Sequence, residues 1–192
     1  MPLPANLNVA LKEWAVVCNA LATGKQMLLL RKGGISESIG GFEIEHREFL
    51  FFPTYLHQNA TMLKPAQRAA LIPASAEPQH VRITAAGQIT DILRVSGRPA
   101  MDRLRDQHIW DEPLIDMRFN YRPQNPLYLL LVRAYVLPRE IEIENTIAYA
   151  GCKSWVPLER PLELSGATPV LSDPDYAERR AVILQRLETP AT

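Results

Sequence analysis

Two stretches of the chain are apolar at almost every position. Residues 27–30 read Met-Leu-Leu-Leu, and residues 127–137 are interrupted only by Arg133. Side chains of a strand point alternately to its two faces, so a strand covered on both faces needs apolar residues throughout. The two stretches predict two deeply buried strands.

Other segments alternate between apolar and polar residues, as half-buried strands do. Residues 42–46 alternate and residues 49–52 are wholly apolar, which predicts a third strand that Pro53 ends. Further strands are predicted over 81–84 and 89–95, separated by a turn at 85–88, over 141–147, and in a short piece ending at Val156.

The remaining pattern predicts helices and connecting loops. Residues 7–13 are expected to form a short helix, and residues 14–21 a strand that forms a hairpin with 27–30. Helical spacing of apolar residues predicts helices from about residue 63 to 72 and over 110–121 and 176–187, and the start signal at residues 96–99 predicts a helix over 100–107. Residues 157–174 are expected to form a surface loop.

These elements predict an α+β fold, a single domain whose mainly antiparallel sheet has helices packed on one side. We assign residues 1–156 to the α+β core and residues 157–192 to a C-terminal loop and docking helix of the same domain. The length of 192 residues suffices for one such core.

Charge, hydrophobicity and cysteine content limit the binding partners and the cellular location that can be expected. Lysine plus arginine equals aspartate plus glutamate at 21 each, so net charge favours neither nucleic acid nor an anionic membrane. No apolar run approaches the roughly 20 residues of a membrane helix, and the N-terminus lacks a secretory signal, so a cytoplasmic protein without a membrane partner is expected. Cys18 and Cys152 have no CxxC neighbour and are expected to be ordinary thiols.

A basic, glycine-containing segment follows the first buried strand. It consists of Arg31, Lys32, Gly33 and Gly34. Two cations beside two glycines provide charge and accessible backbone N–H groups for a phosphate or carboxylate. The segment lacks the spacing of a P-loop or a dinucleotide-binding motif, and a solvated strand end explains it equally well.

A second polar block follows the third strand. His57 is a candidate general base or phosphate donor, and Gln58 and Lys153 complete the predicted ligand-binding set. The leading hypothesis is therefore recognition of a phosphate-bearing ligand, either a nucleotide or nucleic acid.

Two alternatives remain open. Glu13, Glu43 and Glu45 are candidate ligands of Mg²⁺ in a metal-dependent phosphodiesterase or nuclease, with His57, Glu13 and Glu45 as candidate catalytic residues. The Glu-x-Lys pattern of such nucleases lacks its lysine here. The other alternative is a non-catalytic scaffold or regulatory partner, and the sequence does not decide whether the protein is an enzyme or which cofactor it uses.

Arginines and tyrosines also interleave in the second half of the chain. Arg118, Arg122 and Arg133 alternate with tyrosines in a manner that suits stacking on single-stranded nucleic acid. The same residues suit a sheet edge with paired arginines.

Four blocks carry a resemblance to a known family. They are residues 11–16 (LKEWAV), 28–35 (LLLRKGGI), 52–58 (FPTYLHQ) and 151–155 (GCKSW). In these blocks the chain resembles a bacterial family known as domain of unknown function 1802, over roughly residues 9–156. The resemblance implies a bacterial cytosolic protein and brings no known activity, ligand or cofactor.

Overall fold

The computed structural model describes residues 3–32, 37–38, 41–42, 45–151 and 153–188. Its main feature is a seven-stranded mixed sheet in the order β2-β7-β6-β5-β1-β8, with β9 paired to β7. β1 and β5 are parallel and the other pairs of this sheet are antiparallel. The strands are β1 (Asn6–Trp14), β2 (Leu28–Lys32), β5 (Glu48–Thr54), β6 (His80–Arg94), β7 (Leu127–Glu144), β8 (Trp155–Glu163) and β9 (Thr168–Pro169). Two short strands, β3 (Glu37–Ser38) and β4 (Gly41–Phe42), pair separately.

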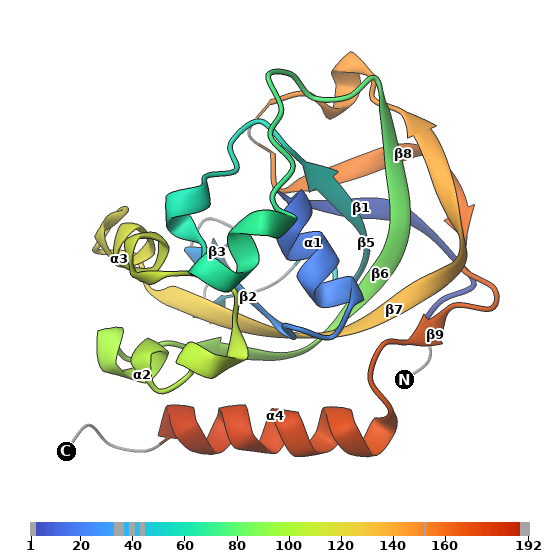
Figure 1. Cartoon of the computed structure of the whole chain (residues 1–192). Coiled ribbons are helices and arrows are strands. Elements are labelled where there is room, and N and C mark those ends of the chain that lie inside the picture. The colour runs from blue at the N-terminus through green and yellow to red at the C-terminus, as the bar shows by residue number, and fades with distance from the viewer. Residues whose placement is uncertain (1–2, 33–36, 39–40, 43–44, 152, 189–192) are drawn as a thin grey trace.

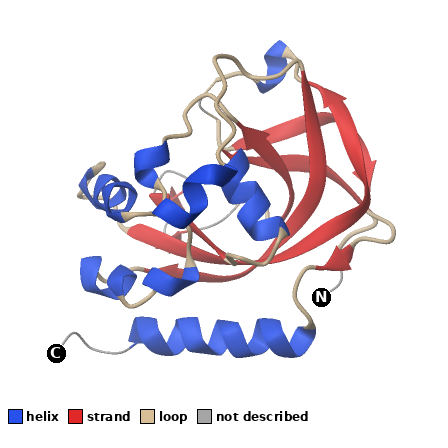
Figure 2. Cartoon of the chain, in the orientation of Figure 1, coloured by secondary structure: helices blue, strands red, loops and turns tan. Residues whose placement is uncertain are grey.

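Four α-helices and four short 3₁₀ helices complete the described part of the chain (Figure 2). The α-helices are α1 (Ala15–Ala22), α2 (Arg98–Asp102), α3 (Glu112–Asn120) and α4 (Asp173–Glu188). The 3₁₀ helices are η1 (Ala60–Met62), η2 (Pro65–Ala70), η3 (Arg105–Gln107) and η4 (Ile147–Tyr149). Among the described residues, no helix is long and apolar enough to cross a membrane.

The apolar run in β5 explains how the core is divided. Phe49 and Phe51 belong to one cluster of buried side chains, whereas Leu50 and Phe52 belong to the other. Alternate residues of a strand point to opposite faces, so both faces of this sheet are buried. All four α-helices contribute buried residues to the first cluster and none to the second. The predicted α+β fold, mainly antiparallel with helices on one side, is confirmed.

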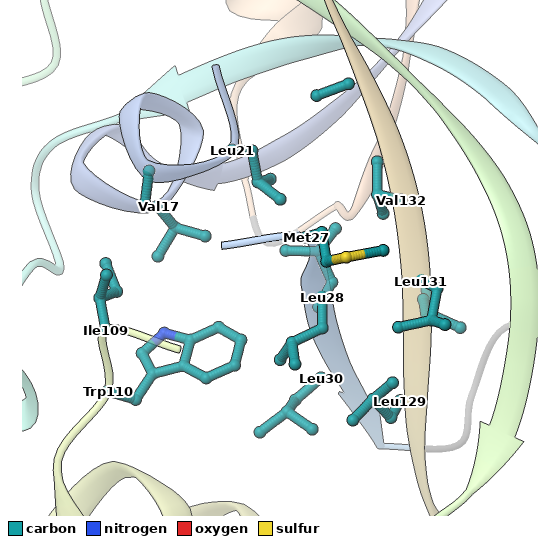
Figure 3. Close-up of a cluster of buried hydrophobic side chains, with 14 of the residues drawn as sticks. Val17, Leu21, Met27, Leu28, Leu30, Ile109, Trp110, Leu129, Leu131 and Val132 are labelled. Carbon is teal, nitrogen blue, oxygen red and sulfur yellow. The ribbon is translucent and has the colours of Figure 1, made fainter. Parts of the chain in front are cut away.

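α1 lies on the concave side of the bent sheet, and its residues Val16, Val17, Cys18, Ala20 and Leu21 belong to the first cluster (Figure 1). In Figure 3, Val17 and Leu21 of α1 face Leu28 of β2 and Val132 of β7. Leu28, Leu29 and Leu30 are at most 1% exposed, so the prediction of a deeply buried strand here is confirmed.

The prediction for the N-terminal segment is wrong. Residues 6–14 form β1, and residues 15–22, expected to be a strand, form α1. Leu7, Val9 and Leu11 lie at alternate positions of β1, which lies between β5 and β8, and the small Ala10 between them is also buried. The β-branched Val16 and Val17 are accommodated in α1 because burial outweighs their modest helix penalty.

The expected turn at 85–88 and the expected strand end near Pro138 are also wrong, because β6 and β7 are single long strands. Gly87 lies where a Cβ would stand 2.7 Å from the Phe51 ring, so this glycine permits close packing and marks no turn. Pro138 lies in an irregularity of the β6–β7 ladder, where a missing N–H is tolerated.

Smaller corrections concern the other elements. The helix expected from about residue 63 to 72 is replaced by η2, which η1 precedes. The helix expected over 100–107 becomes α2 and η3, and that over 110–121 is shortened to α3. Pro53 does not end its strand, since β5 reaches Thr54 beside β1. The first part of the expected loop over 157–174 is strand β8, and α4 follows with Tyr176 and Ile183 buried.

Candidate functional site

A cavity of about 840 Å³ opens at one edge of the sheet. Its walls carry four cationic side chains and two carboxylates, namely Lys12, Arg31, Arg118, Lys153, Glu13 and Glu77. His57 also lines it. Of the residues predicted from sequence, Glu13, Arg31, His57 and Lys153 therefore share one cavity.

Strand direction explains why these residues meet. β1 and β5 run parallel with Glu13 opposite Pro53 and Trp14 opposite Thr54, so their carboxyl ends lie at the same edge. β8 runs antiparallel to β1, which brings the residues before its start to that edge, and Lys12 N donates to Ser154 O at 2.8 Å. The open edge beyond the ends of parallel strands is a common position for ligand sites.

The deepest polar contact of the cavity is an ion pair between Arg31 and Glu13. Arg31 Nη1 lies 2.8 Å from Glu13 Oε2, and the two side chains are 10% and 12% exposed. Three strands separate β2 from β1 in the sheet order, so the contact requires the sheet to curl until β2 faces β1. Arg31 Nη1 also donates to Leu30 O at 2.9 Å, while the buried Arg31 Nε has no hydrogen-bond partner within the described ranges.

Glu13 is held in place by its own backbone surroundings. Its Oε1 accepts a hydrogen bond from Trp14 N at 3.0 Å, and its main-chain oxygen accepts from Thr54 Oγ1 at 3.1 Å. The buried Cys18 thiol also lies near, at 3.7 Å from Glu13 O. Burial raises the pKa of the Cys18 thiol well above its ordinary value, and Glu13 raises it further. This thiol is therefore a poor nucleophile at neutral pH.

Arg118 of α3 is a second guanidinium at the same end of the cavity. Its Nε is buried and has no hydrogen-bond partner in the part of the chain that is described. Burial lowers the pKa of Arg118, the Glu13 carboxylate raises it, and Arg31 lowers it. Among the described residues, the Glu13 carboxylate thus attracts both guanidinium groups, and the two guanidinium groups repel each other.

A wall of the cavity is made by residues 77–79 and 145–147. Glu77 accepts hydrogen bonds from the backbone N–H groups of Tyr55 and Leu56, both at 3.0 Å to Oε1. Asn145 Nδ2 donates to Pro78 O at 2.9 Å, which ties the end of β7 to the start of β6. The Glu77 carboxylate is therefore held in place by backbone donors.

The two lysines of the site differ. Lys12 Nζ donates to the main-chain oxygens of Tyr149 and, at 3.2 Å, of Gly151, and it lies 5.7 Å from the centre of the Phe52 ring. Lys153 is exposed at the rim. Lys12 is therefore a fixed positive charge, and Lys153 is accessible to a ligand.

Other predicted ligand-binding residues have different surroundings. Lys32 Nζ donates to Phe119 O at 3.1 Å at the end of α3, and it does not line the cavity. Gln58 Oε1 accepts from Val16 N at 2.9 Å in the first turn of α1, and its Nε2 donates to Ile72 O at 3.2 Å. Gly33 and Gly34 lie outside the described residues.

The residues of the metal hypothesis are not assembled by the described part of the chain. Glu45 is exposed, lies 3.5 Å from His46 Nε2, and is not among the residues that line the cavity. Glu43 lies outside the described residues. Among those that are described, no group of three or more His, Cys, Asp or Glu side chains is placed to hold a metal ion.

The interleaved arginines do not form one surface. Arg122 stacks on Tyr121 at 5.3 Å, while Arg133 pairs with Asp173 and lies 5.1 Å from the Tyr176 ring. Only Arg118 of the three lines the cavity. The sequence pattern grouped Arg118 with Arg122 and Arg133, and it gave Glu77 no role. The position of Glu77 shortly before a predicted strand was the one feature of the sequence that could have indicated its place at the cavity.

Comparison with known proteins identifies a family. The family described as Domain of unknown function (DUF1802) matches residues 10–182, so the chain belongs to this family and the resemblance noted in the sequence is confirmed. No curated protein matches the sequence.

One solved structure shows a distant likeness. It is a serine-to-alanine mutant of ZmASCH from Zymomonas mobilis, with 11% identity, a TM-score of 0.40, and coverage of 95% of this chain and 99% of that one. A likeness of this size does not establish a common fold or function.

Proposed function

We propose that the protein binds a phosphate-bearing ligand, a nucleotide or nucleic acid, in the cavity at the ends of β1 and β5. The observation that carries this proposal is the group formed by the Arg31–Glu13 ion pair and the guanidinium of Arg118, which line the same cavity.

An anion would complete the hydrogen bonds of Arg31 and Arg118. A buried charge is costly unless it is paired and hydrogen-bonded, and both Arg31 Nε and Arg118 Nε have no partner among the described residues. A phosphate oxygen supplies negative charge and several acceptors at once, and the planar guanidinium is suited to bind it with two parallel hydrogen bonds. A bound phosphate would place negative charge beside both guanidinium groups.

The rest of the lining supports the same class of ligand. The cations Lys12, Arg31, Arg118 and Lys153 outnumber the carboxylates Glu13 and Glu77. His57 is exposed at the cavity, where a ring N–H can donate to a phosphate oxygen. The cavity volume, about 840 Å³, lies within the range of roughly 300–1,000 Å³ that is typical of small-molecule sites.

Isothermal titration with each ribonucleoside 5′-monophosphate and with a ten-nucleotide RNA tests the proposal. Arg118→Gln removes a cation whose Nε has no hydrogen-bond partner among the described residues, so binding should weaken by roughly 10- to 100-fold, the equivalent of about 1.5–3 kcal/mol. Arg122→Gln is the matched control, because Arg122 is exposed near the end of α3 and does not line the cavity.

Glu13→Gln should change the affinity in the opposite direction to Arg118→Gln. Removing the carboxylate that competes for Arg31 should tighten binding of a phosphate-bearing probe, whereas a site for cationic ligands would lose affinity. The proposal fails if no phosphate-bearing probe binds, or if Arg118→Gln and Arg122→Gln bind with equal affinity.

A further inference from the structure

The surface next to the cavity differs in charge from its interior. A second hollow of about 420 Å³ shares Tyr149 with the cavity and is lined by Glu142 and Glu144 of β7 and Glu159 of β8, with one cation, Arg160. Outside this hollow, Arg82 lies 3.7 Å from Glu142. Negative charge therefore dominates this side, and a polyanionic strand that left the cavity across it would meet like charges.

Two exposed residues that line the cavity have apolar side chains. Leu56 is 43% exposed and Ile147 is 91% exposed, and both line the cavity. Exposed apolar side chains at the mouth of a charged cavity favour a ligand with a flat or apolar part. Leu56 and Ile147 lie in the wall that the contacts of Glu77 and Asn145 hold together.

Amide groups stand beside these apolar side chains. Gln79 and Asn145 both line the cavity, and Asn145 N donates to Gln79 O at 2.7 Å. Amide side chains offer a donor and an acceptor together, which is the pattern that the edge of a nucleobase requires. The cavity thus has a deep cationic end and a rim that combines apolar and amide groups.

Resting on the proposed function, we infer that the ligand is a small phosphomonoester with an aromatic base, a mononucleotide, and that it is not a nucleic-acid strand. The phosphate binds between Arg31 and Arg118, and the base covers Ile147 and Leu56. The acidic hollow beside the cavity opposes any continuation of the ligand as a polyanion.

Comparative titration distinguishes the ligand classes. The probes are inorganic phosphate, the four ribonucleoside 5′-monophosphates, and ten-nucleotide RNA strands with and without a 5′-phosphate. At least one monophosphate should bind about tenfold or more tightly than inorganic phosphate and than either strand. Its salt dependence should correspond to one phosphate group, whereas a bound strand contributes a slope of about −0.7 for every phosphate it places on the protein.

Two variants test the two halves of the inference. Ile147→Asn should weaken monophosphate binding about fivefold or more and leave binding of inorganic phosphate unchanged, because only the base contacts the rim. Ile72→Asn is the matched control, since Ile72 is 59% exposed and does not line the cavity. The double variant Glu142→Gln/Glu159→Gln should improve binding of the RNA strands and leave that of the monophosphates unchanged.

The outcomes separate this inference from the proposed function. The inference of a mononucleotide is overturned if an RNA strand binds more tightly than every monophosphate. It is also overturned if inorganic phosphate binds as tightly as the monophosphates do. In both cases the proposal that the cavity binds phosphate stands. Equal affinities of Ile147→Asn and the unmodified protein for the monophosphates also overturn it. If none of the probes binds, the proposed function fails and this inference fails with it.

Discussion

Acidification from pH 7.5 to 5.0 should destabilise the protein through His108, which lies far from the proposed ligand contacts. The His108 side chain is buried, with only 6% of the residue exposed, and neither ring nitrogen has a hydrogen-bond partner among the described residues. Burial, and after it the nearby Lys64, lower the pKa of His108 to about 4. Arg98 acts in the same direction, while Asp106 and the backbone of Trp110 act in the opposite one.

Proton uptake by His108 sets the direction and the size of the change in unfolding free energy with pH. Below its ordinary pKa of 6.5, His108 takes up a proton in the unfolded chain and stays neutral in the folded one, so the free energy of unfolding falls as the pH falls. Between pH 6.5 and 5.0 the loss is about 2 kcal/mol, from about 1.4 kcal/mol per pH unit. It reaches about 3 kcal/mol near pH 4, where the folded state also becomes protonated.

Urea denaturation followed by tryptophan fluorescence measures this loss at pH 7.5 and 5.0. In His108→Gln, which cannot titrate, the difference in unfolding free energy between the two pH values should shrink by about 2 kcal/mol. His57→Gln is the control, because His57 is exposed. If His108→Gln loses as much stability on acidification as the unmodified protein, the reasoning about this imidazole is refuted.

Three further predictions concern stability and can be checked by the same denaturation measurement at pH 7.5. Gly87→Ala should cost roughly 1–3 kcal/mol by overpacking between β5 and β7, whereas Gly97→Ala should cost much less, because its nearest neighbour would lie at 3.7 Å. Gln58→Ala should cost about 1 kcal/mol by removing an acceptor in the first turn of α1, and an unchanged midpoint would contradict that role. Arg31→Met should cost roughly 3 kcal/mol because it leaves Glu13 buried without its partner. In a double-mutant cycle, adding Glu13→Gln should recover part of that loss, and strict additivity would show that the pair does not interact.

The local sequence was enough to identify buried strands but not every boundary. Leu28–Lys32 and the apolar part of Glu48–Thr54 were predictable because both faces of each strand are covered, which requires uninterrupted apolar residues. Residues 6–22 were misassigned because short apolar segments fit a strand or a helix equally well without knowledge of their neighbours. Gly87 indicated a turn in the sequence, and only the packed Phe51 ring reveals why a glycine is required.

The residues of the candidate site were also predictable only in part. Glu13, Arg31, His57 and Lys153 were singled out from local patterns, and the structure brings all four to one cavity. Lys32, also singled out, donates to a backbone oxygen of α3 instead. Local patterns do not show which of two neighbouring side chains lines the cavity, because the direction of each side chain depends on the helices and strands packed against it.

Patterns in the sequence are enough to establish the α+β class, the family and the residues that carry charge near the strand ends. Two features become visible only in three dimensions: the sheet curls until Arg31 reaches Glu13, and α3 adds Arg118 to the same cavity. Composition and periodicity record which side chains are buried or charged, whereas sheet curvature and helix placement result from packing among segments far apart in the chain. The grouping of Arg31, Glu13 and Arg118, on which the proposed function depends, is a product of that packing.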